Sequence, residues 1–316
     1  YDWEKEIIVT AGSIEGISAT IMAVTEPGDE ILIPEPTYTS YREVIYLSGC
    51  KPVMVPLNEE RGWAFELEAY RRAITSKTKA IFYCNPNNPT GTIYTREQLL
   101  GLADLAKEFD LFLISDEVYK DFVFDKEVLC GMNKETGKRH IFSLAELPKL
   151  REKVIRLFSF SKAYAMTGWR IGYLHTDEKV AREILKVHDS LVTCAPVISQ
   201  YAAMGALEMG EKDIIKFNKS FKDRRDLACQ RLDRLKDYFS YIKPQGAYYV
   251  FPKILKGETD SWKLANDLIE KIQVAVVPGF AFGDNGEGHF RVNFGRNESD
   301  INKAFDRLEK YCEKIN

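Results

Sequence analysis

Short apolar runs alternate with helix-like segments through the first two-thirds of this 316-residue chain. Each run has the length of a buried strand, and the segments between the runs carry apolar residues at helical spacing. The runs lie at residues 6–10, 30–33, 52–57, 79–84, 111–115, 154–159 and 170–174. Strands of this kind separated by helices predict a mainly parallel sheet between two helical layers, that is, a three-layer α/β sandwich.

The pattern of the chain changes after about residue 176. Three helical stretches come first, then three short strand-like segments and a final helix, at 177–190, 196–209, 213–239, 247–251, 274–277, 290–294 and 299–314. This order predicts a smaller C-terminal α+β domain. We therefore expect a large domain over 1–212 and a small domain over 213–316. The polar, irregular residues 130–153 are expected to form a surface insertion.

Composition and charge argue against several functions. The formal net charge of −3 gives no basic field for nucleic acid, and the pair Arg224-Arg225 is expected on a solvated helix face. Six scattered cysteines and four histidines lack the spacing of metal ligands, so no metal site is expected. No apolar run approaches the roughly 18 residues that span a bilayer, and we expect no secretory signal peptide. We expect a cytoplasmic protein without a membrane partner.

Residues with binding chemistry follow several of the predicted strands. Ligands of an open α/β sheet collect beyond the carboxyl ends of its strands. Ser13 follows the first run at the start of a helix, where free N–H groups suit a phosphate. Three later runs are followed by an aromatic ring, an amide and a carboxylate: Tyr38, Asn88 and Asp116. Each also has a structural alternative, namely ring packing, a tight turn and a helix N-cap. A carboxylate at the mouth of an apolar strand needs a cationic partner, and a protonated pyridine nitrogen is one.

The run at 154–159 is followed by two hydroxyls, an amine and a guanidinium, from Ser159, Ser161, Lys162 and Arg170. The hydroxyls and the guanidinium can hold a phosphate through charge-assisted hydrogen bonds. Lys162, beside that anion and away from bulk water, can form an imine with a carbonyl compound. A phosphate anchor next to such a lysine predicts a site for pyridoxal 5′-phosphate, PLP.

Arg291 lies in the middle of the strand-like run 290–294, where an unpaired guanidinium would be unfavourable. Taken alone, a structural ion pair is the simpler explanation. The alternative is that Arg291 binds a substrate carboxylate through two parallel hydrogen bonds. The nearby residues 283–288 are expected to form a flexible loop.

Taken together and in this order, the motifs at 85–91, 115–119, 159–172 and 290–294 resemble those of the fold-type I, class I/II aminotransferases of the aspartate aminotransferase superfamily. The likeness runs over essentially the whole chain. It implies that Lys162 holds PLP as a Schiff base and then moves the proton, that Asp116 pairs with the pyridine nitrogen, and that Tyr38 stacks on the ring. Asn88 and Tyr119 would bind the phenolic oxygen. The phosphate would be held by Ser13, Ile14, Ser159, Ser161 and Arg170, and the substrate α-carboxylate by Arg291.

The same resemblance implies that an L-amino acid gives its amino group to a 2-oxo acid such as 2-oxoglutarate, in a homodimer. It also implies cis peptide bonds before Pro36 and Pro89. Members of the family begin several tens of residues upstream of Tyr1, so the large domain is expected to be incomplete at its N-terminal end.

Two other functions remain open at this point. A PLP-dependent C–S β-lyase would use the same residues. A non-catalytic effector domain, as in some bacterial transcription regulators, or an inactive truncated fragment could also retain Lys162 and Arg291.

Overall fold

The computed structural model describes residues 1–132 and 137–314. Its centre is a seven-stranded sheet in the order β1-β9-β8-β5-β4-β2-β3. The strands, in that order, are Ile7–Thr10, Gly172–His175, Val154–Ser159, Phe112–Asp116, Thr78–Cys84, Glu30–Glu35 and Lys51–Pro56. β9 runs antiparallel to both of its neighbours, and the other pairs are parallel.

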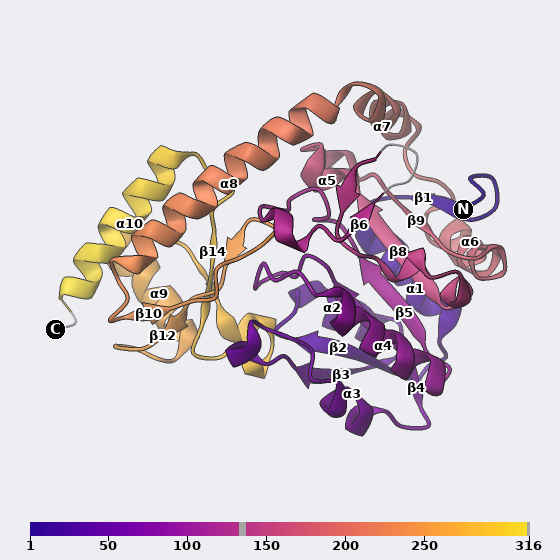
Figure 1. The fold of residues 1–316 in the computed structure, drawn as a ribbon, viewed down its shortest axis with the longest axis horizontal. Coiled ribbons are helices and arrows are strands. Elements are labelled where there is room, and N and C mark those ends of the chain that lie inside the picture. Colours follow the sequence, from indigo (N-terminus) through magenta and orange to yellow (C-terminus); the bar gives the residue numbers. More distant parts are fainter. Residues whose placement is uncertain (133–136, 315–316) are drawn as a thin grey trace.

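Helices cover both faces of this sheet, as Figure 1 shows. Those before the C-terminal part are α1 (Ser13–Val24), α2 (Thr39–Leu47), α3 (Leu67–Ala73), α4 (Arg96–Glu108), α5 (Phe160–Ala163), α6 (Glu178–Val192) and α7 (Val197–Met209). Side chains alternate between the faces along each strand: Ile31 and Ile33 of β2 pack in one core with α1, α2 and α6, whereas Leu32 packs in a second core with α3 and α4. The predicted three-layer α/β sandwich is confirmed.

The C-terminal part contains a three-stranded antiparallel sheet in the order β11-β14-β13, made of Tyr249–Val250, Phe290–Asn293 and Val277–Pro278. A second pair joins β10 (Phe239–Ser240) to β12 (Lys253–Ile254). Three helices accompany them: α8 (Glu211–Asp233), α9 (Ser261–Ile272) and α10 (Glu298–Glu313). The long α8 runs from α7, beside the large sheet, to α10 (Figure 1).

Two predicted segments differ from the structure near the site. The run at 170–174 begins as a strand only at Gly172, because Arg170 closes a 3-10 turn with a left-handed backbone, φ 51°. In the segment 274–277, the strand β13 begins only at Val277, which pairs with Arg291 of β14. An apolar run predicts that a strand exists, but it does not fix the residue at which the strand begins, because a preceding turn can carry the same kinds of side chain.

The expected surface insertion at 130–153 contains the short strands β6 (Gly131–Met132) and β7 (Arg139–His140). Its later part is not confined to the surface, since Phe142 and Leu144 are buried in the second core. Residues 133–136 of this segment lie outside the described residues. The 3-10 helices of the chain are Glu59–Arg61, Lys126–Val128, Leu144–Glu146, Pro148–Leu150, Thr167–Trp169, Gly279–Phe282 and Asp284–Gly286. Among the described helices, none has the length and apolarity that crossing a membrane requires.

Candidate active site

The carboxyl ends of the parallel strands border a cavity of about 290 Å³. Every residue that the sequence predicted for the site lines this cavity: Ser13, Ile14, Tyr38, Asn88, Asp116, Tyr119, Ser159, Ser161, Lys162, Arg170 and Arg291. Tyr41, Val118, Thr167 and Tyr249 line it as well and were not predicted. A larger cavity of about 530 Å³ lies between α9, α10 and β14, and none of the predicted residues borders it. The smaller cavity is therefore the candidate active site.

One end of the cavity gathers hydrogen-bond donors and the guanidinium of Arg170. α1 begins at Ser13, so its first N–H groups have no partner within the helix. The guanidinium of Arg170 lies against Gly12, where a Cβ would come within 2.3 Å of Nη2, and Gly12 has a φ of 85°. Only glycine therefore allows this approach. Ser159 Oγ accepts a hydrogen bond from the Ser161 N–H at 3.1 Å, which orients the two serines.

Asp116, at the end of β5, is a buried carboxylate that forms no ion pair within the described part of the chain. Tyr41 Oη donates to its Oδ2 at 2.7 Å and the Val118 N–H donates to its Oδ1 at 3.1 Å. Burial raises the pKa of Asp116 to about 6, because these two donors compensate only part of the loss of hydration. A cation placed against this carboxylate would restore its ionised form.

Lys162 lies in α5, directly after β8. Burial lowers the pKa of its amine, and the positive charges of Arg291 and Arg170 lower it further, against the opposing charge of Asp116. Its Nζ lies 6.0 Å from the ring centre of Tyr119 and 5.9 Å from that of Tyr248. A lowered pKa increases the fraction of neutral amine, which is the form that acts as a nucleophile or a base.

Arg291 is not part of an ion pair among the described residues, which decides against the structural alternative. Its Nη1 donates to Asn88 Oδ1 at 2.8 Å, and its buried Nε has no hydrogen-bond partner within that part of the chain. The guanidinium lies over the rings of Tyr249 and Phe282, at 4.3 and 4.9 Å from their centres. A cation held by aromatic faces and left without a counter-charge is suited to bind a carboxylate.

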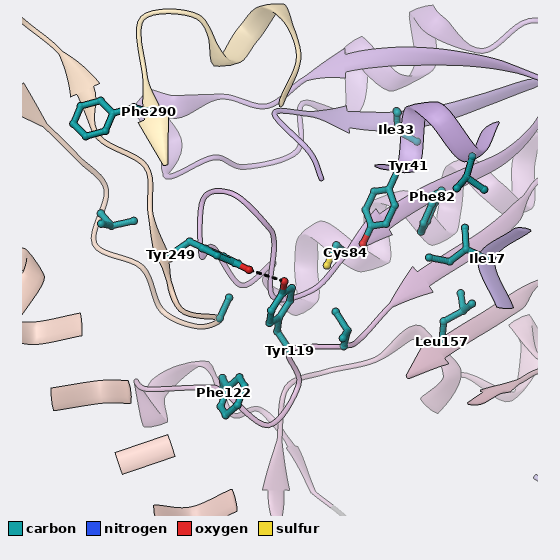
Figure 2. Close-up of a cluster of buried hydrophobic side chains, with 14 of the residues drawn as sticks. Ile17, Ile33, Tyr41, Phe82, Cys84, Tyr119, Phe122, Leu157, Tyr249 and Phe290 are labelled. Carbon is teal, nitrogen blue, oxygen red and sulfur yellow. Dashed lines mark hydrogen bonds between the residues drawn. The ribbon is translucent and has the colours of Figure 1, made fainter. Parts of the chain in front are cut away.

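The hydroxyls of Tyr119 and Tyr249 form a hydrogen bond of 3.1 Å, which is drawn as a dashed line in Figure 2. Asn88 Nδ2 donates to the Tyr119 hydroxyl at 3.4 Å. Burial raises the pKa of the Tyr119 phenol well above its usual value, so the hydroxyl keeps its proton at neutral pH. Peptide bonds before Pro36 and Pro89 are cis, as expected, and the bond before Pro86 is cis as well.

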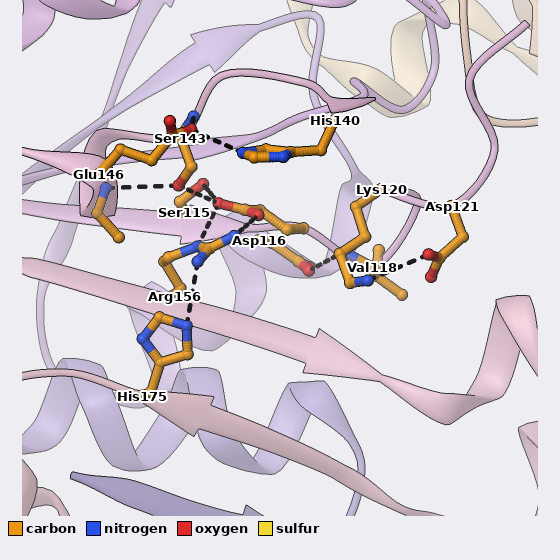
Figure 3. Close-up of polar contacts among 12 residues, drawn as sticks. Ser115, Asp116, Val118, Lys120, Asp121, His140, Ser143, Glu146, Arg156 and His175 are labelled. Atoms are coloured by element: carbon orange, nitrogen blue, oxygen red, sulfur yellow. Dashed lines mark hydrogen bonds and ion pairs between the residues drawn. The ribbon is translucent and has the colours of Figure 1, made fainter. Parts of the chain in front are cut away.

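A buried ion pair lies beside the cavity. Glu117, directly after β5, and Arg156, in the middle of β8, form two hydrogen bonds, and Ser143 Oγ donates another to the carboxylate at 2.9 Å. Arg156 also contacts His175 Nε2 at 3.2 Å, and Figure 3 shows this network. Burial alone would raise the pKa of Glu117, but Arg156 and Ser143 bring it below its usual value.

Comparison with known proteins places the chain in one family. The family model for "Aminotransferase class I and II" matches residues 1–308. The chain is 34% identical to the putative aminotransferase YugH of Bacillus subtilis, over 99% of this chain and 78% of the relative. It is 36% identical to a probable aspartate aminotransferase of Methanocaldococcus jannaschii, over 99% and 79% of the two chains.

A solved structure agrees with these sequence relatives. The aromatic aminotransferase of Pyrococcus horikoshii superposes with a TM-score of 0.91 at 33% identity, over 99% of this chain and 81% of that one. The fold and the sequence therefore point to the same family. The chain belongs to the class I and II aminotransferases and is a transaminase of amino acids.

Proposed function

We propose that this aminotransferase binds PLP in the candidate active site and transfers the amino group of an L-amino acid to a 2-oxo acid such as 2-oxoglutarate. One observation carries the proposal: a single cavity combines a lysine of lowered pKa, a buried carboxylate without a cation and a guanidinium without a carboxylate. Each of the three lacks a partner that PLP or an amino acid would supply.

The donors around the cavity fit PLP at both ends. The N–H groups at Ser13 and Ile14, with Ser159, Ser161 and Arg170, would hold the phosphate. At the ring, Asp116 would face the pyridine nitrogen, Asn88 and Tyr119 would hold the phenolic oxygen, and Tyr38 would stack on the face. The Tyr41 hydroxyl fixes the orientation of the Asp116 carboxylate for this task.

The residues of the chain then divide the reaction between them. When bound, PLP supplies the electron sink that acidifies the α-hydrogen of the amino acid. Arg291 would bind the α-carboxylate and so fix the α-carbon near Lys162. Lys162, as a neutral amine, would carry the proton between that carbon and C4′ of the coenzyme. The two guanidinium groups of Arg170 and Arg291 against the single charge of Asp116 leave the site positive even when Lys162 is neutral, which favours a phosphate and a carboxylate together.

Replacing Lys162 with alanine is expected to abolish the absorbance band that PLP gives with the protein, because the band needs the Schiff base at Nζ. The exposed Lys179 is a matched control, and Lys179→Ala should keep the band. Absorbance spectra of the purified variants mixed with PLP give the answer. A band that persists unchanged in Lys162→Ala would show that the lysine has been assigned wrongly.

The same preparations separate the transaminase from the C–S β-lyase alternative. Amino transfer to 2-oxoglutarate supports the proposal. Release of pyruvate and ammonia from cystathionine without such transfer would support the lyase instead. A protein that shows the band but neither reaction would favour a non-catalytic effector domain or an inactive fragment.

We further propose that the enzyme is a cytoplasmic homodimer whose chains divide into a large domain at 1–212 and a small domain at 213–316. α7 supports the dimer, because it exposes a face with a single charged residue, Glu208. The exposed apolar side chains of this helix are Val197, Ile198, Tyr201, Met204, Leu207 and Met209. A row of six exposed apolar side chains on one surface helix is typical of an interface. The six free thiols suit a reducing compartment.

Ile198→Glu is expected to weaken the dimer by at least about tenfold, because the symmetry of a dimer places the new charge in the interface twice. Leu255→Glu is the matched control, because Leu255 is also an exposed apolar residue but does not belong to α7. Sedimentation over a range of concentrations measures both variants. A wild-type protein that sediments as a single chain would refute the dimer.

A further inference from the structure

Tyr249 reaches two groups of the candidate site from outside the large sheet. It belongs to β11, where it pairs with Asn293 of β14, two residues from Arg291. Its ring lies under the Arg291 guanidinium at 4.3 Å, and its hydroxyl lies 3.1 Å from that of Tyr119. The side chain is buried, and strand pairing on one side and Arg291 on the other fix its position.

The number of hydrogen-bonding groups on Tyr119 gives the direction of this contact. A phenol has one proton to donate and two lone pairs that accept. Under the proposed function, the Tyr119 hydroxyl would donate its one hydrogen bond to the phenolic oxygen of PLP. The two protein groups in contact with the Tyr119 hydroxyl must then both donate hydrogen bonds to it. Asn88 Nδ2 does so at 3.4 Å, and the Tyr249 hydroxyl must be the donor of the 3.1 Å contact.

We propose that Tyr249 is a positioning residue that donates its hydroxyl proton to Tyr119 and thereby strengthens the hydrogen bond from Tyr119 to the coenzyme. This inference rests on the proposed function and deepens it. A donor becomes stronger when its own oxygen accepts a hydrogen bond, because consecutive hydrogen bonds polarise one another. Hydrogen bonds to the phenolic oxygen stabilise its ionised form, so Tyr249 lowers the pH at which the PLP-loaded protein changes its spectrum.

A double-mutant cycle tests the route through Tyr119. Tyr249→Phe keeps the ring against Arg291 and removes only the hydroxyl. In the wild-type background it should raise the midpoint pH of the spectral change by about half a unit, as expected for the cooperative part of one charge-assisted hydrogen bond. In a Tyr119→Phe background the same substitution should shift the midpoint by much less, since the hydroxyl it acts through is gone.

Tyr70→Phe is the matched control, because Tyr70 is also a buried tyrosine and its hydroxyl has no partner among the described residues. It should leave the midpoint unchanged, and thermal melting should show all variants folded. An unchanged midpoint in Tyr249→Phe, or equal shifts in both backgrounds, would overturn the inference while leaving PLP binding intact. Loss of the Lys162-dependent band in the wild type would instead overturn the proposed function and this inference with it.

Discussion

Replacing Asp116 with asparagine is expected to lower the rate of transamination by roughly 10²–10⁴-fold and, in the same protein, to stabilise the PLP-free form above pH 6. Under the proposed function, the loss of rate follows because Asp116 would no longer place a buried negative charge against the pyridine nitrogen. The uncompensated half of a buried pair is destabilised by about 3–5 kcal/mol. In the Asp116→Asn variant the group left without its partner would be the coenzyme, so the penalty would raise the free energy of the PLP-loaded enzyme and of the transition state.

The PLP-free Asp116→Asn variant is expected to gain stability because the wild-type carboxylate has no cation among the described residues when PLP is absent. Without PLP, the carboxylate has only Tyr41 and the Val118 N–H as donors, and burial raises its pKa to about 6 from the usual 3.8. A group whose pKa is raised by folding stabilises the fold most below its unfolded pKa, and this contribution is lost as the pH rises through about 6. The difference corresponds to roughly 3 kcal/mol at neutral pH. Asparagine carries no charge and avoids this loss.

Urea unfolding of the PLP-free proteins at pH 5 and at pH 8 measures the effect. The advantage of Asp116→Asn over the wild type should be larger at pH 8. Asp237→Asn, at an exposed aspartate, should show no such difference. An asparagine variant less stable than the wild type at pH 8 would mean that the carboxylate is well paired in the free protein, against the geometry described above.

Glu117→Gln is expected to destabilise the protein by about 3–5 kcal/mol, although Glu117 is the next residue in the chain and equally buried. Here the carboxylate already has its cation, because Arg156 forms two hydrogen bonds with it. The substitution would leave the Arg156 guanidinium, whose side chain is only 20% exposed, without a counter-charge. A loss of this size is a large part of the net stability of about 5–15 kcal/mol that is usual for a folded domain.

Glu152→Gln provides the matched control, because Glu152 pairs with Lys179 at 3.0 Å on the surface. Exposed pairs contribute about 0–1 kcal/mol, so this variant should unfold close to the wild type. Since folding lowers the pKa of Glu117, its stabilising effect is present above the usual pKa of 4.5 and declines as the pH falls below that value. Denaturant unfolding at pH 7 and pH 4 should therefore show a smaller penalty for Glu117→Gln at pH 4. Equal stability of the two glutamine variants at pH 7 would contradict the prediction.

The residues of the candidate site could be predicted because most of them follow strands. Asp116 and Lys162 come within a few residues of an apolar run, and a parallel sheet brings such positions to one edge. Tyr41 was missed although it lies only three residues after Tyr38. Its hydroxyl reaches Asp116 because α2 begins at Thr39 and turns the side chain inward, and the sequence did not mark that helix start.

Contacts between distant segments could not be predicted in this way. Tyr249 meets Tyr119 across 130 residues of chain, and no local pattern distinguishes it from other aromatic core residues. The interpretation of Arg225 as a solvated helix residue is wrong for the same reason. It is 2% exposed and pairs with Asp125 at 2.9 Å, a partner 100 residues earlier in the chain. Helical spacing shows which residues share a face and does not show what covers that face.

The expected flexible loop at 283–288 is also wrong in part. Glu35, at the end of β2, accepts a hydrogen bond from the Asp284 N–H at 2.6 Å through its side chain. Asn285 Nδ2 donates to the backbone oxygens of Glu35 and Leu57, at 2.9 and 3.1 Å. Glycines and polar residues here permit a tight turn rather than disorder, and the turn ties the C-terminal part to the large sheet.

The reversed direction of β9 explains how an arginine that precedes a strand joins residues that follow strands. The neighbours of β9, which are β1 and β8, run antiparallel to it and leave the sheet at the edge where β9 enters, so the connection 160–171 between β8 and β9 is a hairpin at that edge. Both the amine of Lys162 and the guanidinium of Arg170 are carried on this one hairpin. The positions of these two side chains relative to each other are thus set within a single local segment, so changes in the length of other loops leave their spacing unaltered.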